Sequence, residues 1–259
     1  MFTPRLKLAE INTDLPGRIF VFGDIHGNLD VLETGLDRVD EDDLVIFLGD
    51  YADRGDEGVE VIERIDKLID SRPESVIALR GNHEEYLPDG SPTFMPADLP
   101  QEAMQKRGNW RTYFPRFQNF VAKLYLLALL PGYALFVHGG ITTGVDGRDD
   151  LMDPVTNIHQ ALLWSDPSMT DGELPNRRGI GTEFGPDITE YTLEKLGVEH
   201  IIRSHEPRKA VHGPVCEQND RIVTLNSTNV YGGDPFVLII DPGDPPHSQD
   251  EFDSASVFL

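Results

Sequence analysis

The chain has 259 residues, 39% of them hydrophobic, which is enough for one large domain or two small ones with a sizeable buried core. Its 45 acidic residues outnumber the 22 basic ones, and the formal net charge is −23. A field of that sign repels nucleic acid and anionic membranes, so we expect neither as a partner.

The N-terminal segment, the apolar runs and the cysteine content predict where the protein resides. The stretch 1–17 has no continuous apolar segment of the kind found in a secretory signal. The longest apolar run, 124–130, is too short to span a bilayer. Since Cys216 is the only cysteine, no intramolecular disulfide can form, and we expect a cytoplasmic protein. The acid-rich, Lys-poor composition is typical of a high-salt cytoplasm, although an acidic surface that maintains solubility explains it equally well.

The first third of the chain predicts alternating strands and helices. The apolar runs 18–22, 44–48 and 75–79 have the length of buried strands, and a polar motif follows each of them. Between them, apolar residues recur at helical spacing over 29–39 and 61–69. This order implies parallel strands with right-handed crossovers. Ligands bind where the carboxyl ends of such strands meet, so we expect the three motifs to form one site.

The remainder of the chain is less regular. Segment 86–118 is Pro-rich at its start, and we expect an irregular cap over the site. A helix is expected over 120–130, and Asp187 with Glu190 fits a capping box at the start of another helix. Further strands are expected at 133–137, within 200–206, at 221–225 and at 235–240.

These elements predict an α/β fold with one domain over 1–245, whose core covers about 18–241. The tail at 246–259 is rich in Asp, Pro and Ser, and we expect it to be mobile.

Side chains of metal-binding types follow five of the expected strands. A set that mixes oxygen and imidazole ligands suits Mn, Fe or Zn, whereas Ca and Mg prefer oxygen alone. A lone His or Asp is more often a structural or turn residue, so only their coincidence at five strand ends indicates a site. The residues are Asp24, His26, Asp50, Asp53, Arg54, Asn82, His83, His138 and His205.

The motifs occur in the order of a known family. "GDIHG", "GDYADRG", "RGNHE", "VHGGI" and "RSHE" closely resemble the signature of the metal-dependent Ser/Thr phosphoprotein phosphatases. These are the PPP branch of the calcineurin-like metallophosphoesterases. "LLWSDP" and "NRRGIGTEFGPD" resemble protein phosphatases rather than nucleotide hydrolases. The resemblance implies two mixed β-sheets sandwiched between helices. Segment 86–118 departs from the eukaryotic pattern, and we expect a prokaryotic member.

The resemblance implies a site with two divalent metal ions, most simply Mn, with Fe or Zn as alternatives. Asp50 would bridge the ions. Asp24 and His26 would complete the first ion's ligands, and Asn82, His138 and His205 those of the second.

The resemblance also implies roles around the metals. His83 would be the general acid, oriented by Asp53. The residues that would bind the substrate phosphate are Arg54, Arg178, Asn82 and Tyr231, with Arg177 as an alternative to Arg178.

The expected function is hydrolysis of phosphoserine and phosphothreonine in protein partners by a hydroxide shared between the two metals. A symmetrical diadenosine tetraphosphatase is an alternative, because such enzymes share the first three motifs. A non-catalytic phosphopeptide-binding relative would require a broken ligand set, and every ligand is present.

Overall fold

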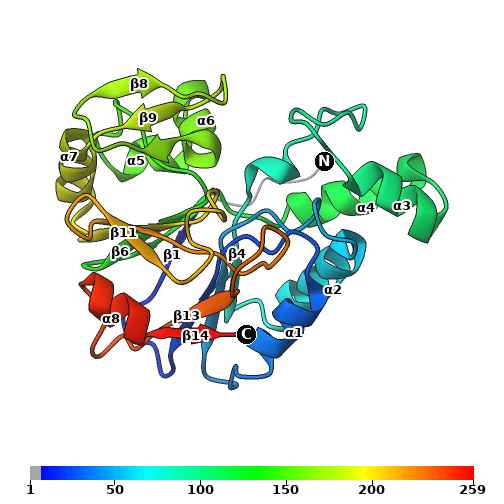
Figure 1. Cartoon of the computed structure of the whole chain (residues 1–259), viewed down its shortest axis with the longest axis horizontal. Helices are drawn as coiled ribbons and strands as arrows, with labels where there is room; N and C mark the ends of the chain where they lie inside the picture. Colours follow the sequence, from blue (N-terminus) through cyan, green and yellow to red (C-terminus); the bar gives the residue numbers. More distant parts are fainter. Residues whose placement is uncertain (1–6) are drawn as a thin grey trace.

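Two mixed sheets form the centre of the computed structural model, which describes residues 7–259 (Figure 1). The five-stranded sheet has the order β14 (Ser256–Phe258), β13 (Phe236–Ile240), β2 (Ile19–Phe22), β3 (Leu44–Phe47) and β4 (Val76–Ala78). The six-stranded sheet has the order β1 (Leu8–Glu10), β5 (Leu127–Leu130), β6 (Ala134–Val137), β10 (His200–Arg203), β12 (Ile222–Thr224) and β11 (Val215–Glu217).

Helices cover the outer faces of the two sheets (Figure 1). The five-stranded sheet packs against α1 (Leu29–Leu36), α2 (Gly58–Ser71) and α4 (Trp110–Val121), with α3 (Leu99–Arg107) beside them. On the other side lie α5 (Arg148–Met152), α6 (Thr156–Trp164), α7 (Pro186–Leu196) and a small sheet of β7 (Asp166–Pro167), β9 (Thr182–Phe184) and β8 (Glu173–Pro175). The expected sandwich of two mixed sheets between helices is confirmed.

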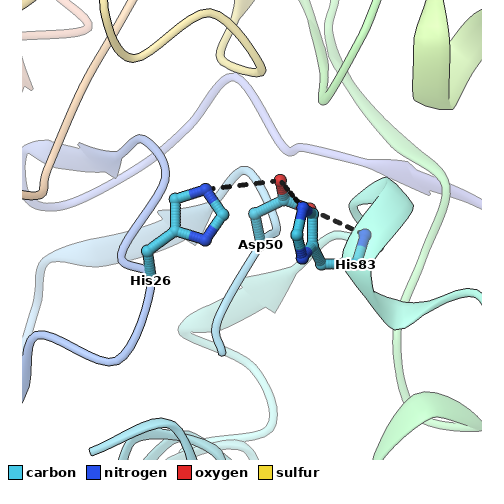
Figure 2. Close-up of side chains that lie close together, drawn as sticks. All are labelled: His26, Asp50 and His83. Carbon is cyan, nitrogen blue, oxygen red and sulfur yellow. Dashed lines mark hydrogen bonds and ion pairs between the residues drawn. The ribbon is translucent and has the colours of Figure 1, made fainter. Parts of the chain in front are cut away.

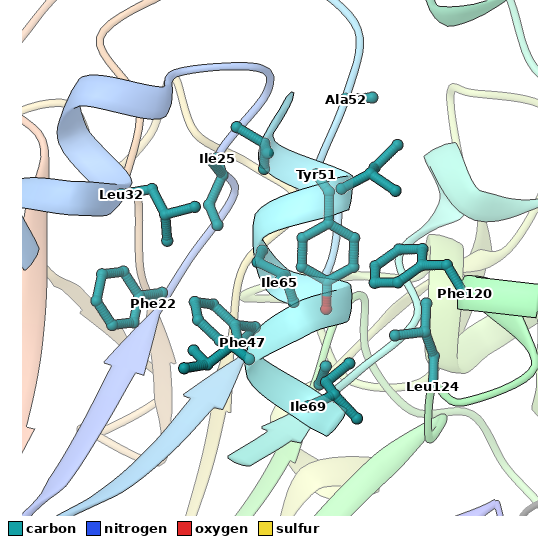
Figure 3. Packing of buried hydrophobic residues seen from close by; sticks show 14 of the residues in the cluster. Phe22, Ile25, Leu32, Phe47, Tyr51, Ala52, Ile65, Ile69, Phe120 and Leu124 are labelled. Atoms are coloured by element: carbon teal, nitrogen blue, oxygen red, sulfur yellow. The ribbon is translucent and has the colours of Figure 1, made fainter. Parts of the chain in front are cut away.

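Alternation along the strands builds three apolar layers. In β2, Phe20 and Phe22 face the helices, whereas Ile19 and Val21 face the other sheet, as a two-residue period requires. The same alternation in β5 sends Leu127 to the far helices and Ala128 to the layer between the sheets. Figure 3 shows the layer under α2, where Phe22 and Phe47 lie near Tyr51 and Phe120. Because strands of both sheets are buried on both faces, they hold the loops at their ends rigidly.

Parallel pairing brings the polar motifs to one edge. Strands β2, β3 and β4 are parallel neighbours, and so are β6 and β10. Gly49 has a φ of 111° and its α-carbon lies against the backbone of Gly81, where any side chain would collide. These two glycines let the loops after β3 and β4 approach each other closely.

Three expectations about secondary structure are wrong. The helix expected over 120–130 ends with α4 at Val121, and residues 127–130 form β5 between β1 and β6. The segment 86–118 is irregular as expected only as far as Asp98, and the remainder forms α3 and most of α4. Asp187 is not an N-cap, since α7 begins at Pro186 and the Asp187 carboxylate accepts a hydrogen bond from the Gly172 amide.

The C-terminal segment is also not a mobile tail. Residues Gln249–Ser254 form α8, and β14 pairs antiparallel with β13. Phe252 is completely buried in the layer between the sheets. The folded unit therefore extends beyond the expected boundary at residue 245. None of the helices in residues 7–259 is long and apolar enough to cross a membrane.

Candidate metal centre

A cleft of about 560 Å³ opens at the carboxyl ends of the central strands. It contains eight of the sequence-predicted residues, and Asp24, Asp53 and His138 are buried beside it. The structure therefore brings the whole predicted set together. Those that line the cleft are His26, Asp50, Arg54, Asn82, His83, Arg178, His205 and Tyr231.

The loops that carry these residues have unusual backbone conformations. His26, Asp50, Asp53, Arg54 and His205 all have φ between 47° and 73°, in the left-handed region that non-glycine residues rarely adopt. Such conformations persist only where the surrounding structure enforces them, and they concentrate at functional sites. Here the Asp50 carbonyl accepts hydrogen bonds from the His26 amide at 2.9 Å and the Ile25 amide at 3.1 Å, which ties the first two loops together.

Two imidazoles are oriented by the backbone. The Nδ1 of His26 lies 2.9 Å from the Ala52 carbonyl, and that of His138 lies 3.0 Å from the Leu48 carbonyl. A carbonyl can only accept, so each Nδ1 carries the proton and each Nε2 exposes a lone pair. The Nε2 atoms face the Asp50 carboxylate at 3.7 Å for His26 and 3.4 Å for His138. This is the arrangement that prepares histidines as metal ligands.

Several potential ligand atoms converge on the His138 ring. Its Nε2 lies 3.0 Å from both the Asn82 Oδ1 and the His205 Nδ1. Within residues 7–259, the buried Asp24 Oδ2 has no hydrogen-bond partner, and it lies 3.7 Å from the His26 Nε2. Buried polar atoms are normally satisfied, so unpaired acceptors facing one another fit a bound cation.

The acceptors form two groups that share Asp50. Its carboxylate lies within 4.8 Å of ligand atoms of His26 and His83 in one group, and of His138 and His205 in the other. Figure 2 shows His26 and His83 on opposite sides of the Asp50 carboxylate. The residues present therefore fit two ions with one shared carboxylate.

Electrostatics favour the same conclusion. Burial lowers the pKa of His26 to about 4 and that of His138 to about 3, so both imidazoles are neutral near pH 7. Burial, followed by repulsion from Asp24 and Glu84, raises the pKa of Asp50 well above its usual value. Cations in the cleft would relieve that repulsion and restore the ionised carboxylate.

His83 forms a buried pair with Asp53. Its Nδ1 donates to the Asp53 Oδ2 at 2.7 Å, and the Asp53 Oδ1 accepts the backbone amides of Asp98 at 2.5 Å and Leu99 at 2.7 Å. Burial favours the neutral form of Asp53, but these hydrogen bonds outweigh it and lower its pKa. Burial lowers the pKa of His83, and Asp53 opposes that shift. The His83 ring thus has a fixed orientation and turns its Nε2 towards Asp50, at 3.9 Å.

Two arginines line the cleft. The Arg54 Nη1 donates to the Pro96 carbonyl at 2.8 Å, and the Arg178 Nε donates to the Asp166 carboxylate at 2.9 Å. Among the residues that the structure describes, Arg178 lines the cleft and Arg177 does not. Tyr231 packs its ring edge against His26, with centroids 5.6 Å apart.

Three supporting residues were not assigned roles from the sequence. Glu84 accepts the backbone amides of Asp50, Tyr51 and Gly81 at 3.0, 3.1 and 2.8 Å, which fixes the loop of Asp50. It follows His83 in the "RGNHE" motif, which was the available signal. Ser204 bonds to both the amide and the carboxylate of Asp24. Arg203, completely buried, pairs with Asp166 at 3.0 Å and so supports the partner of Arg178.

Comparison with known proteins identifies similar chains. The model of the family described as calcineurin-like phosphoesterase matches residues 17–209. Serine/threonine-protein phosphatase T of Aspergillus oryzae is 30% identical over 86% of this chain and 48% of its own length. Serine/threonine-protein phosphatase 5 of Arabidopsis thaliana is 29% identical over 87% of this chain and 42% of its own length. The chain spans about half the length of these relatives or somewhat less.

A solved structure gives a similar result. The protein serine/threonine phosphatase from Saccharomyces cerevisiae superposes with a TM-score of 0.77 at 28% identity. The match covers 99% of this chain and 83% of the yeast chain. The likeness therefore extends over the C-terminal elements as well as over the motifs.

Proposed function

Because the chain belongs to the calcineurin-like phosphoesterases, we propose that it is a metal-dependent protein phosphatase that hydrolyses phosphoserine and phosphothreonine monoesters. The observation that carries this proposal is the buried Asp50 carboxylate, shared between His26 in one group and His138 and His205 in the other, with the His83–Asp53 pair beside it. The names of the similar proteins support the substrate class.

We assign the ligands as the sequence suggests. Asp24, His26 and Asp50 would hold one ion, and Asp50, Asn82, His138 and His205 would hold the other. Mn suits this mixture of oxygen and imidazole ligands, and Fe or Zn would also fit it. When bound, the ions supply neutralisation of phosphoryl charge and a water of lowered pKa.

His83 would donate the proton that the leaving group needs. Serine and threonine alkoxides are poor leaving groups, so their departure requires a general acid. The His83 Nδ1–H is held by Asp53, which leaves Nε2 as the atom that faces the cleft and gives up its proton. Asp53 would thereby keep the ring oriented and favour its protonated form.

Arg54 and Arg178 would bind the phosphoryl group. A planar guanidinium can donate to two oxygens at once, and both side chains line the cleft. Asn82 and Tyr231 also line the cleft and would complete the phosphate site. A cytoplasmic location, a prokaryotic origin and phosphorylated proteins as partners stay predictions.

Parallel assays with two substrates test the proposal. Manganese-loaded protein is offered a phosphothreonine peptide and diadenosine tetraphosphate at equal concentration, at low and molar salt, and released products are measured. We expect faster turnover of the peptide, and no turnover after metal is removed by a chelator.

Two other outcomes of these assays would each contradict a different part of the proposal. A preference for the nucleotide would be consistent with the metal assignments, but it would refute the proposal that the substrate is a phosphorylated protein. Stoichiometric binding of the peptide without turnover would instead indicate a non-catalytic phosphopeptide-binding protein.

A further inference from the structure

A second cluster of metal-binding side chains lies at the opposite end of β10 from the cleft. His200 begins this strand and His205 lies two residues beyond its end at Arg203, and the strand alone extends over roughly 10 Å. Ligand atoms of Glu199, His200 and His247 all lie within 4.8 Å of one another. We call these three residues the tail cluster, because His247 precedes α8 in the C-terminal segment (Figure 1, red).

The His200 ring has a fixed tautomer. It is 4% exposed, and its Nδ1 lies 2.8 Å from the Asp220 carbonyl, which can only accept. The Nε2 therefore presents a lone pair to the cluster. Hydrogen bonding of one ring nitrogen to a backbone carbonyl is the support that metal-binding histidines commonly have.

The other two ligand atoms lie at metal-site spacing. The His247 Nδ1 is 3.3 Å from the His200 Nε2 and 3.0 Å from the Glu199 Oε2. Ligands about 2.0–2.1 Å from a tetrahedral Zn²⁺ ion are separated by about 3.3 Å. Without an ion, a single N–H of His247 would have to serve both acceptors.

The backbone holds both halves of the cluster in place. The amides of Glu199 and His200 donate to the Tyr133 carbonyl at 2.8 and 3.0 Å. The Tyr133 hydroxyl donates to the Pro246 carbonyl at 2.8 Å, beside His247. The His247 amide in turn donates to the Glu251 carboxylate at 2.7 Å. The ligands thus come from two segments that are already docked together.

The geometry points to a site in which Glu199, His200 and His247 bind a divalent cation of the zinc type and fasten the C-terminal segment to the six-stranded sheet. Two neutral imidazoles and one carboxylate form a common zinc ligand set, in which water occupies the fourth position. The side chains of Glu199 and His247 are 59% and 49% exposed, so a cation can enter and water can complete its shell.

Zinc counting tests this site without reference to catalysis. The full chain is freed of metal, loaded with zinc and desalted, and zinc per chain is measured by mass spectrometry. Replacement His247→Ala should bind one ion fewer than the parent, whatever the cleft holds. The control is His212→Ala, which removes a histidine that is 78% exposed and lies 3.4 Å from Asp234.

One further variant and two further measurements keep the test decisive. Glu199→Gln, at an exposed position, should weaken zinc binding in the same way if His247→Ala fails to fold. In ¹⁵N NMR spectra, zinc should shift the His200 Nε2 resonance of the parent and leave Nδ1 protonated. Zinc should also slow amide exchange of α8 in the parent, and not in His247→Ala.

Some results would overturn the inference. Equal zinc content in the parent and His247→Ala, with an unchanged His200 resonance, would show that the three side chains form only a hydrogen-bonded cluster. An equal loss of zinc in His212→Ala would show non-specific binding to surface histidines.

Discussion

In the cleft, His26 and His138 each donate a hydrogen bond from Nδ1 to a backbone carbonyl, and His200 does the same in the tail cluster. The surroundings of these rings differ. The cleft histidines are almost completely buried and face Asp50, whereas His247 and Glu199 of the tail cluster are about half exposed. The same hydrogen bond from Nδ1 to a backbone carbonyl therefore orients an imidazole in both sites. The groups around each ring determine the function of the site.

The neighbours in the cleft are those that a reaction needs. Arg54 and Arg178 can bind an anion, and the His83–Asp53 pair can deliver a proton. The tail cluster lies instead against Phe252, whose ring is 5.4 Å from that of His200 and completely buried. We conclude that the first site is suited to chemistry and the second to holding the chain. The following variants test this division.

Asp50→Asn should have the largest effect. Loss of the shared carboxylate charge should reduce phosphate release by at least about 10⁴-fold, because both groups of ligands depend on Asp50. Zinc at the tail cluster should be retained, and mass spectrometry measures it. Asp42→Asn, at an exposed position, is the control. Near-normal turnover of Asp50→Asn would refute the dinuclear site.

Phe252→Ala should lower the free energy of unfolding by about 3–5 kcal/mol, since it empties a fully buried aromatic position. Denaturant unfolding measures this change. Phe258→Ala removes a ring that is 50% exposed and should cost far less. Equal effects of the two substitutions would mean that the C-terminal segment does not anchor the fold.

His83→Asn should reduce turnover of a phosphothreonine peptide by about 10²–10³-fold, because the alkoxide then leaves without a proton. An aryl phosphate, whose phenolate leaves readily, should lose much less. His159→Asn is the control, since His159 pairs with Glu85 at 2.9 Å and does not line the cleft among the described residues. Equal losses on both substrates would contradict the role as general acid.

Arg178→Ala should raise the Michaelis constant for the peptide by about 10–100-fold through loss of charged hydrogen bonds to phosphate. Arg177→Ala is the matched control, and its kinetics should stay close to those of the parent. The reverse result would move the phosphate-binding role to Arg177.

Asp53→Asn should have the smallest of these effects, which is a displacement of the pH profile of turnover. Burial lowers the pKa of His83, and Asp53 opposes this shift, so removal of the carboxylate should lower that pKa further. The acid must be protonated to act, so the alkaline limb of turnover should move to lower pH. A shift to higher pH, or none, would contradict the pairing.

The sequence predicted the residues of the site better than the secondary structure of the segments between and after the motifs. Each proposed metal ligand lies within four residues of the end of a strand, and parallel pairing within each sheet brings neighbouring strand ends to the same edge. The supporting role of Glu84 was missed although the "RGNHE" motif contains it, because its three hydrogen bonds go to backbone amides that only the fold brings near it.

The missed elements share a physical cause. Residues 127–130 form a strand buried on both faces, and such a continuous apolar run cannot be distinguished from a buried helix by periodicity. In the C-terminal segment, the polar composition gave no indication that Phe252 is a buried anchor. The structure of that segment depends on pairing with β13 and on burial between the two sheets. Local composition indicates neither contact.

Anomalous X-ray scattering from manganese-loaded crystals of the full chain tests the central claim most directly. We predict two peaks in the cleft, about 3.5–4 Å apart, on either side of the Asp50 carboxylate. A single peak, or peaks away from Asp50, would contradict the account.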